Sequence, residues 1–321
     1  MSSARQMLAK LATDVRPSLF RYMADHRVRG EFSVSVDGSL IDIIRRHDDS
    51  FIRISRSNAV YLVNVIEQFD DFFNAVSPVM IRRAGKQCLM VDFSSPRLQQ
   101  VIGFGDFPVL CPSLTEGAGA NQQWIDVACL AEGETAIDLG AYNGMISILF
   151  SKAVGPTGRV VALEPDPLNF FAADYNFATH RRVNGLSNIS LVAAAASAED
   201  GVLSLSSEGA TGSALTSIVG KRRGATVPVE ALSLETLADR QGLDKVDFMK
   251  VDIEGAELDL IPKSVDFLRR YRPRLLVEPH LIQGRCTSGV VTKTLSDLGY
   301  VLTTIDHRGV PVPFIAASLP S

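Results

Sequence analysis

The sequence predicts an α/β fold in which a Rossmann-like, mostly parallel sheet follows a small α+β domain. From Glu134 onward, short apolar runs alternate with helical segments, which is typical of a parallel sheet with helices on both faces. Glycine-containing turns follow the apolar runs, at the strand ends where such sheets bind ligands. We expect the α+β domain to cover residues 1–120 and the sheet domain to cover residues 121–321.

The composition is that of an ordinary globular enzyme. The 321 residues are 46% hydrophobic and 21% charged, with a formal net charge of −4. A general nucleic-acid binder would be basic overall, so no nucleic-acid partner is expected. The four cysteines form no CxxC pair, which argues against a disulfide framework or a zinc knuckle. Neither a signal peptide nor a run long enough for a membrane span is found, which predicts a cytoplasmic protein.

The first domain mixes helix and strand signals. A helix is expected over about Ser3–His26, and a second is expected from a cap at Asn58 to about Val76, where apolar residues recur at three-to-four spacing. Five strands are expected, at Glu31–Val36, Leu40–Ile44, Phe51–Ser55, Val79–Arg82 and Cys88–Asp92. The role of this domain is left open between the substrate side of the site and homo-oligomerisation.

The second domain repeats the order strand, turn, helix. Its strands are expected at Thr135–Leu139, Arg159–Leu163, Ile189–Ala193, Phe248–Val251 and Arg274–Val277, followed by a hairpin of Tyr300–Ile305 and Val312–Ala316. Helices are expected from the turn at Gly140–Gly144 to about Val154, over Pro167–Arg182 and over about Ala256–Tyr271. The segment 208–224 is rich in glycine, serine, alanine and threonine and is expected to be a mobile surface loop.

A glycine turn follows the first of these strands. Gly140 and Gly144 let the backbone turn sharply and approach a ligand closely. Their G-x-x-x-G spacing differs from a dinucleotide fingerprint, so a pyrophosphate is not the expected ligand. Asp138 beside the turn is suited to orient the ammonium group of an amino-acid head through water. The alternative is that the two glycines serve only close packing of helix on strand.

Acidic residues end three later strands of the same domain. Glu164 ends the second strand, where a carboxylate can accept hydrogen bonds from the ribose of an adenosine. Asp252 belongs to a charged run after the fourth strand, and such clustering costs desolvation energy unless the groups are paired or used. Glu278 and His280 follow the strand after that. In a parallel sheet these ends share one edge with Gly140.

Together these residues resemble the FkbM family of S-adenosylmethionine-dependent methyltransferases. The matching motifs are Asp138-x-Gly140-x-x-Asn143-Gly144-x-x-Ser147, Glu164-Pro165-x-Pro167-x-Asn169 and Lys250-Val251-Asp252-Ile253-Glu254-Gly255-Ala256-Glu257. The third run is distinctive, whereas the first two occur across many class I methyltransferases. The resemblance covers about 134–280, and the expected C-terminal hairpin is typical of the class I methyltransferase sheet. Ser233 departs from the family, which often has aspartate there, and is expected to cap the next helix.

The resemblance implies in-line methyl transfer from S-adenosyl-L-methionine to a hydroxyl on a natural product, glycan or lipid. Cofactor binding would fall to Asp138, Gly140, Asn143, Gly144, Ser147, Glu164, Pro165 and Asp252. A base must help remove the hydroxyl proton, and His280 is the first candidate, with Glu278 or Asp252 as the alternative. The acids could instead hold a divalent cation such as magnesium. Metal-free catalysis is favoured, and no metal ligand is assigned.

Other interpretations stay open at this point. A nicotinamide-dependent oxidoreductase shares the order of strand, glycine turn, helix and acid, and a non-catalytic cofactor-binding or scaffold protein would carry the same domain. His280 could be a satisfied structural histidine, Lys250 an ion-pair partner, and Glu257 a purely structural acid at a helix start. The basic run Lys221-Arg222-Arg223 is expected to be a solvated surface rather than a phosphate site.

Overall fold

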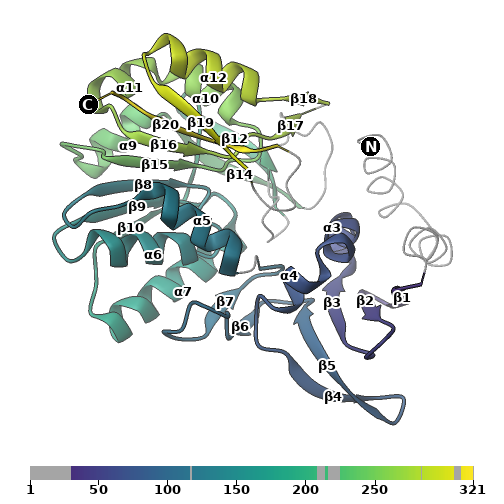
Figure 1. Cartoon of the computed structure of the whole chain (residues 1–321). Coiled ribbons are helices and arrows are strands. Elements are labelled where there is room, and N and C mark those ends of the chain that lie inside the picture. Colours follow the sequence, from purple (N-terminus) through teal and green to yellow (C-terminus); the bar gives the residue numbers. More distant parts are fainter. Residues whose placement is uncertain are drawn as a thin grey trace. The chain divides into compact units, whose positions relative to one another are not determined.

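The computed structural model describes residues 30–115, 118–207, 214–215, 225–282, 284–306 and 312–320. The chain forms two compact units, Met1–Ala118 and Gly119–Ser321, and both are drawn in Figure 1. The helix expected over Ser3–His26 and the basic run at 221–223 lie outside the described residues. Within the described ranges, no helix is both long and apolar enough to cross a membrane.

The first unit is built on a five-stranded sheet of order β1-β2-β3-β5-β4. Its strands are β1 (Phe32–Asp37), β2 (Leu40–Arg45), β3 (Phe51–Ser55), β4 (Val79–Arg83) and β5 (Lys86–Phe93). All five strands expected from alternation are therefore present. Smaller strands β6 (Arg97–Gln99) and β7 (Val109–Cys111) pair with each other. The apolar residues that alternate along β2 and β3 are fully buried, which is why these strands could be read from the sequence.

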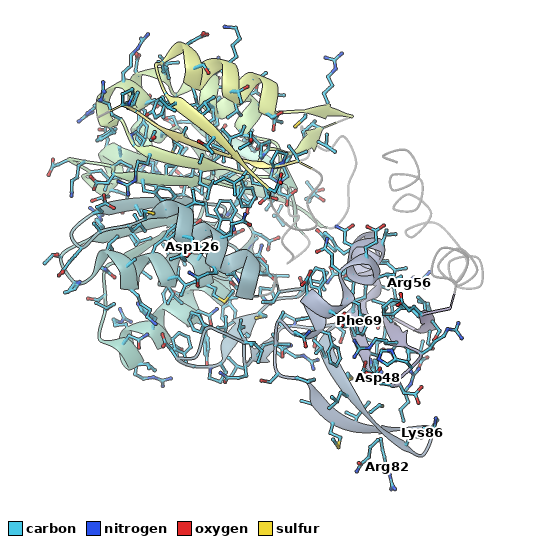
Figure 2. The ribbon with its side chains drawn as sticks, viewed as in Figure 1. Asp48, Arg56, Phe69, Arg82, Lys86 and Asp126 are labelled. Atoms are coloured by element: carbon cyan, nitrogen blue, oxygen red, sulfur yellow. The ribbon has the colours of Figure 1, made fainter. Side chains whose placement is uncertain are left out.

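The continuous helix expected from Asn58 to Val76 is wrong. The chain forms a 3-10 turn η1 (Arg56–Tyr61) and two short helices, α3 (Leu62–Glu67) and α4 (Phe69–Phe73), and the cap is Ser55. Phe69 and Phe73 stack with ring centroids 5.4 Å apart. The guanidinium of Arg45 lies over both rings. The apolar periodicity is thus satisfied by α3 and α4, between which Gln68 leaves helical geometry. Phe69 is labelled in Figure 2.

The second unit contains a seven-stranded sheet of order β10-β9-β8-β15-β16-β20-β19. The strands are β8 (Thr135–Leu139), β9 (Arg159–Leu163), β10 (Ile189–Val192), β15 (Phe248–Val251), β16 (Arg274–Val277), β19 (Val301–Ile305) and β20 (Phe314–Ser318). The first five of these are parallel in register, whereas β20 is antiparallel to both β16 and β19. The predicted Rossmann-like sheet with its antiparallel C-terminal hairpin is confirmed.

Helices cover both faces of this sheet (Figure 1). One face carries α5 (Ala118–Ala128), α6 (Met145–Val154) and α7 (Pro167–Asn184); the other carries α9 (Leu234–Gln241), α10 (Glu257–Lys263), α11 (Val265–Tyr271) and α12 (Ser288–Asp297). Alternate strand residues supply two separate apolar cores, one on each face. Along the chain, β9 and β10 extend the sheet on one side of β8, and β15 then pairs with β8 on its other side. The switch point between β8 and β15 is where sheets of this kind bind ligands.

Three features of this unit differ from expectation. The single helix expected over Ala256–Tyr271 is two, α10 and α11, separated at Ser264, and Pro262 inside α10 has no amide hydrogen to donate. A second sheet of order β11-β14-β12-β13 was missed. It consists of β11 (Ala194–Ala196), β12 (Gly201–Ser207), β13 (Ala214–Leu215) and β14 (Ala225–Leu232). Within the expected loop 208–224, β13 pairs with β12, and the rest lies outside the described residues.

Gly140, directly after β8, lies against the backbone of Asp252, directly after β15. Its φ is +81°, and a Cβ placed on it would stand 1.8 Å from the backbone oxygen of Asp252. A Cβ on Gly144, at φ +79°, would stand 2.4 Å from the ring of Phe177. Packing therefore requires glycine at position 140, where the overlap is with backbone, whereas at position 144 the overlap is with the end of a side chain and the positive φ also favours glycine.

We predict that Gly140→Ala destabilises the chain far more than Gly242→Ala. Both glycines have positive φ, but nothing lies within 4 Å of a Cβ on Gly242. The conformational strain common to both costs roughly 1–2 kcal/mol. The overlap with Asp252 should add roughly 1–3 kcal/mol for Gly140→Ala only. Urea unfolding monitored by circular dichroism measures both variants, and equal losses would contradict the close approach of β8 and β15.

Candidate functional site

A buried ammonium group joins β8 to β15 at the switch point. Lys250 Nζ lies 3.1 Å from Asp138 Oδ1 and 3.5 Å from Asp252 Oδ2. It also donates to the backbone oxygen of Gly140 at 2.9 Å. Ser147 on α6 donates to the other oxygen of Asp138 at 2.6 Å. Burial alone would lower the pKa of Lys250, but the charges of Asp138 and Asp252 raise it by more, so the amine stays charged.

Asp138 and Ser147 are completely buried beneath the glycine turn. Both oxygens of Asp138 face protein groups, Lys250 and Ser147. Lys250 is therefore an ion-pair partner, as one of the sequence-based interpretations expected. That Asp138 and Ser147 help to hold a cofactor stays a prediction. In the structure, Asp138 contacts Lys250 and Ser147, both close to the glycine turn.

Glu164, at the end of β9, is hydrogen-bonded to the glycine turn. Its Oε2 accepts the amide hydrogen of Tyr142 at 2.7 Å, and its Oε1 accepts that of Asp166 at 2.9 Å. Burial raises the pKa of Glu164 to about 8, against the opposing effect of these amides. Because a carboxylate oxygen can accept two hydrogen bonds, Oε2 keeps acceptor capacity for a ligand. This donor and acceptor set suits the two hydroxyls of a ribose.

Asn143 and Pro165 lie on either side of this link. The side-chain oxygen of Asn143 accepts the amide hydrogen of Met145 at 3.2 Å, and Asn176 donates to its backbone oxygen at 2.8 Å. Pro165 is half-buried between Glu164 and the helix cap Asp166. Tyr142 has a φ of +51°, which is uncommon outside glycine and clusters at functional sites. No pattern in the sequence pointed to Tyr142.

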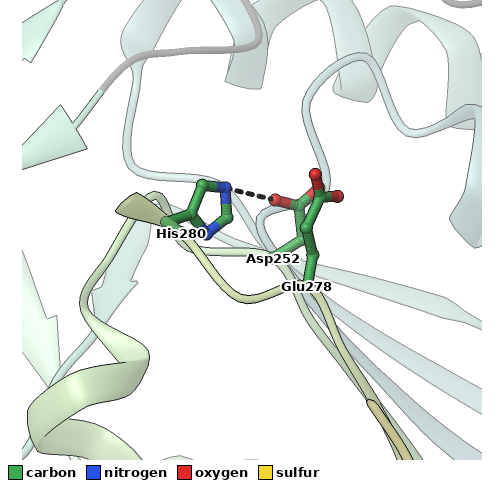
Figure 3. A group of neighbouring side chains, drawn as sticks. All are labelled: Asp252, Glu278 and His280. Atoms are coloured by element: carbon green, nitrogen blue, oxygen red, sulfur yellow. Dashed lines mark ion pairs between the residues drawn. The ribbon is translucent and has the colours of Figure 1, made fainter. Parts of the chain in front are cut away.

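Three side chains converge beyond the ends of β15 and β16, as Figure 3 shows. Asp252, Glu278 and His280 each offer one ligand atom, and these atoms lie within 4.8 Å of one another. His280 Nε2 is 3.7 Å from Asp252 Oδ1 and 3.9 Å from Glu254 Oε2. The three candidate catalytic residues are thus brought together, and the short distance from Asp252 to Lys250 links them to the glycine turn.

The imidazole of His280 is held in place by Glu257. The Glu257 carboxylate is fully buried. Its Oε1 accepts hydrogen bonds from His280 Nδ1 at 3.1 Å, from the His280 amide at 3.0 Å and from Thr287 Oγ1 at 2.8 Å. Its Oε2 accepts the amide hydrogen of Gly255 at 2.9 Å. Glu257 therefore does more than start a helix, and neither its contact with His280 nor that of Thr287 was foreseen.

The charges around His280 determine its protonation. Burial lowers the pKa of His280, but Glu254, together with the hydrogen bond and charge of Glu257, raises it by more, to well above its ordinary value. Burial raises the pKa of Glu257, but His280 and Thr287 lower it by more, so the net pKa is below the ordinary value. The raised pKa favours the protonated imidazole, and carboxylates lie near both ring nitrogens.

The site segment matches a known family. The methyltransferase FkbM domain matches residues 138–302. Methyltransferase sdnD of Sordaria araneosa is 28% identical over 171 residues, which are 44% of this chain and 64% of that protein. The chain thus spans somewhat under two thirds of the length of this relative.

Two methyltransferases are among the solved structures that resemble this chain. Methyltransferase FkbM from Methylobacillus flagellatus is 18% identical with a TM-score of 0.43, over 57% of this chain and 43% of that chain. The O-methyltransferase TomG from Streptomyces achromogenes is 19% identical with a TM-score of 0.41, over 65% of this chain and 83% of that chain.

Removing the buried ammonium should destabilise the second unit. We expect Lys250→Met to lower the free energy of unfolding by about 3–5 kcal/mol, because it leaves the carboxylate of Asp138 buried without a counter-charge. The double variant Asp138→Asn/Lys250→Met removes both charges and should recover part of the loss. Urea unfolding of the wild type, Asp138→Asn, Lys250→Met and the double variant measures this coupling. Strictly additive losses would show that the pair does not interact.

The raised pKa of Glu164 predicts a pH-dependent stability. Its pKa is about 8 in the folded chain and 4.5 ordinarily, so the folded chain keeps a proton that the unfolded chain releases between these values. The free energy of unfolding should therefore fall as pH rises from about 4.5 to 8, by about 1.4 kcal/mol for each pH unit in that range. Glu164→Gln cannot ionise and should lack this component. The exposed control Glu199→Gln should follow the wild type, and parallel profiles for all three would contradict the assignment.

Proposed function

The chain belongs to the FkbM methyltransferase domain family, and from this membership we propose that it transfers a methyl group from S-adenosyl-L-methionine to a hydroxyl. The observation that carries the proposal is the position of Asp252. It lies at the end of β15, bonded through Lys250 to the glycine turn and close to His280 on the other side. A cofactor at the turn and an acceptor at the Asp252, Glu278 and His280 cluster would then meet at one strand end.

The residues present fit this cofactor. Glu164 supplies a carboxylate with free acceptor capacity for the ribose hydroxyls, beside a turn whose geometry is fixed by Tyr142 and Gly140. We propose that the acidic cluster about Asp252 lies toward the sulfonium end. When bound, S-adenosyl-L-methionine supplies a methyl group that is already activated by a positively charged sulfur.

The chain itself must orient the acceptor, exclude water and promote loss of the hydroxyl proton. Asp252, Glu278 and His280 are the groups proposed for the last task. His280 alone is poorly suited as a base, because its raised pKa keeps the imidazole protonated at neutral pH. The proposed acceptor class is a natural product, glycan or lipid, and the cytoplasmic location expected from the sequence stays a prediction.

Cofactor binding provides the first test. We expect one S-adenosylhomocysteine per chain in calorimetric titration and no saturable binding of NAD. Glu164→Ala should weaken that binding at least about tenfold, because it removes the side-chain oxygens that would bond the ribose hydroxyls, whereas Glu199→Ala on an exposed surface should leave it unchanged. Binding of NAD in place of S-adenosylhomocysteine would favour the oxidoreductase interpretation.

The acceptor can be found by isotope labelling. Extracts from cells with and without the gene, grown on methyl-labelled methionine, should differ in a compound that carries one labelled methyl on oxygen. Asp252→Asn, with folding checked by circular dichroism, should abolish the labelled product. If the labelled product were unchanged in a strain that carries only Asp252→Asn, the cluster would have no part in the reaction.

A further inference from the structure

We propose that Asp252, Glu278 and His280 bind a divalent cation of the magnesium or manganese type, with Glu257 holding the histidine ligand in position. The proposal rests on the proposed function for its purpose, since a bound cation would lower the pKa of an acceptor hydroxyl. The existence of the metal site is argued from the geometry of the side chains alone.

The ligand atoms are close to the spacing that one ion requires. Adjacent ligands of an octahedral ion with bonds near 2.1 Å are roughly 3 Å apart, and opposite ligands are roughly 4.2 Å apart. His280 Nε2 and Asp252 Oδ1 are 3.7 Å apart, and with Glu278 the three atoms stay within 4.8 Å. Small side-chain rotations would therefore bring all three to one ion. Three ligands leave coordination positions open for water or a hydroxyl.

The histidine is arranged as metal-ligating histidines are. The Glu257 carboxylate accepts the hydrogen of Nδ1, so a cation that displaces the other ring proton would find the lone pair on Nε2, the atom that faces Asp252. Among the described residues, Nε2 has no partner within hydrogen-bond distance, because Asp252 and Glu254 stand at 3.7 and 3.9 Å. A buried carboxylate behind a ligating imidazole is the usual outer partner that fixes the ring and raises its basicity.

The balance of charge favours a cation at the same place. Asp252, Glu254 and Glu278 bring three carboxylates to the ends of β15 and β16, and Glu257 lies behind them. The ammonium of Lys250 is shared with Asp138, on the far side of Asp252. Glu254 also has a φ of +53°, a strained conformation that brings its carboxylate to the cluster. A cation held by Asp252, Glu278 and His280 would lie beside these carboxylates, whose negative charges favour it.

Metal binding without cofactor tests the proposal directly. Titration of metal-free chain with Mn²⁺, followed by calorimetry and by electron paramagnetic resonance, should give one ion per chain, displaced by Mg²⁺ in excess. Asp252→Asn and Glu278→Gln, both at half-buried positions, should each lower the affinity at least tenfold. Glu257→Gln should lower it about 10- to 100-fold through the ring it orients, with folding checked by circular dichroism.

The matched control is Asp259→Asn. Asp259 is an exposed acid in the first turn of α10, so its loss changes net charge equally but should leave Mn²⁺ affinity unchanged. Absence of a saturable Mn²⁺ signal, or equal affinity in Asp252→Asn, Glu278→Gln and wild type, would overturn the site. Binding of S-adenosylhomocysteine without Mn²⁺ binding would overturn only this inference, whereas Mn²⁺ binding without S-adenosylhomocysteine binding would leave the metal site and overturn the proposed function.

Discussion

The ammonium group of Lys250 is the interaction on which this site depends. It lies between the carboxylates of Asp138 and Asp252 and donates to the backbone oxygen of Gly140. One buried cation therefore joins the ends of β8 and β15, two strands that are far apart in the sequence. Such a cation is costly to bury, and it is compensated only while both strands keep their register. The close approach of Gly140 to the Asp252 backbone follows from the same geometry. The position of Asp252, and with it the cluster around His280, is therefore fixed by the core.

The sequence predicted the parts of the fold that depend on local apolar patterns. Runs such as Thr135–Leu139 and Phe248–Val251 are buried throughout and appear as strands, and Ser233 caps α9 as expected. The second sheet was missed because β14 contains Pro228 and its alternation is weak outside Val227 and Val229. Contacts such as that of Glu257 with His280 join residues 23 positions apart. Their origin is tertiary packing, which periodicity does not encode.

Chemically, the site divides at Asp252. On the β8 and β9 side, Glu164 and the glycine turn present amides and a carboxylate of raised pKa, which suits neutral hydroxyl groups. On the β16 side, carboxylates surround a single imidazole that Glu257 holds from behind, which suits a cation or a proton. Lys250 lies between Asp138 and Asp252 and offsets the repulsion between these two carboxylates. This division matches the two halves of a methyl transfer, an adenosine cofactor and a hydroxyl that must lose its proton.

A crystal structure with S-adenosylhomocysteine bound would show directly whether cofactor and acceptor meet beside Asp252. We expect ribose hydroxyls within hydrogen-bond distance of Glu164 and the sulfur directed toward Asp252, with the Lys250 contacts unchanged. A ligand bound elsewhere, or bound at the glycine turn with its sulfur directed away from Asp252, would contradict the claim that cofactor and acceptor meet at this strand end.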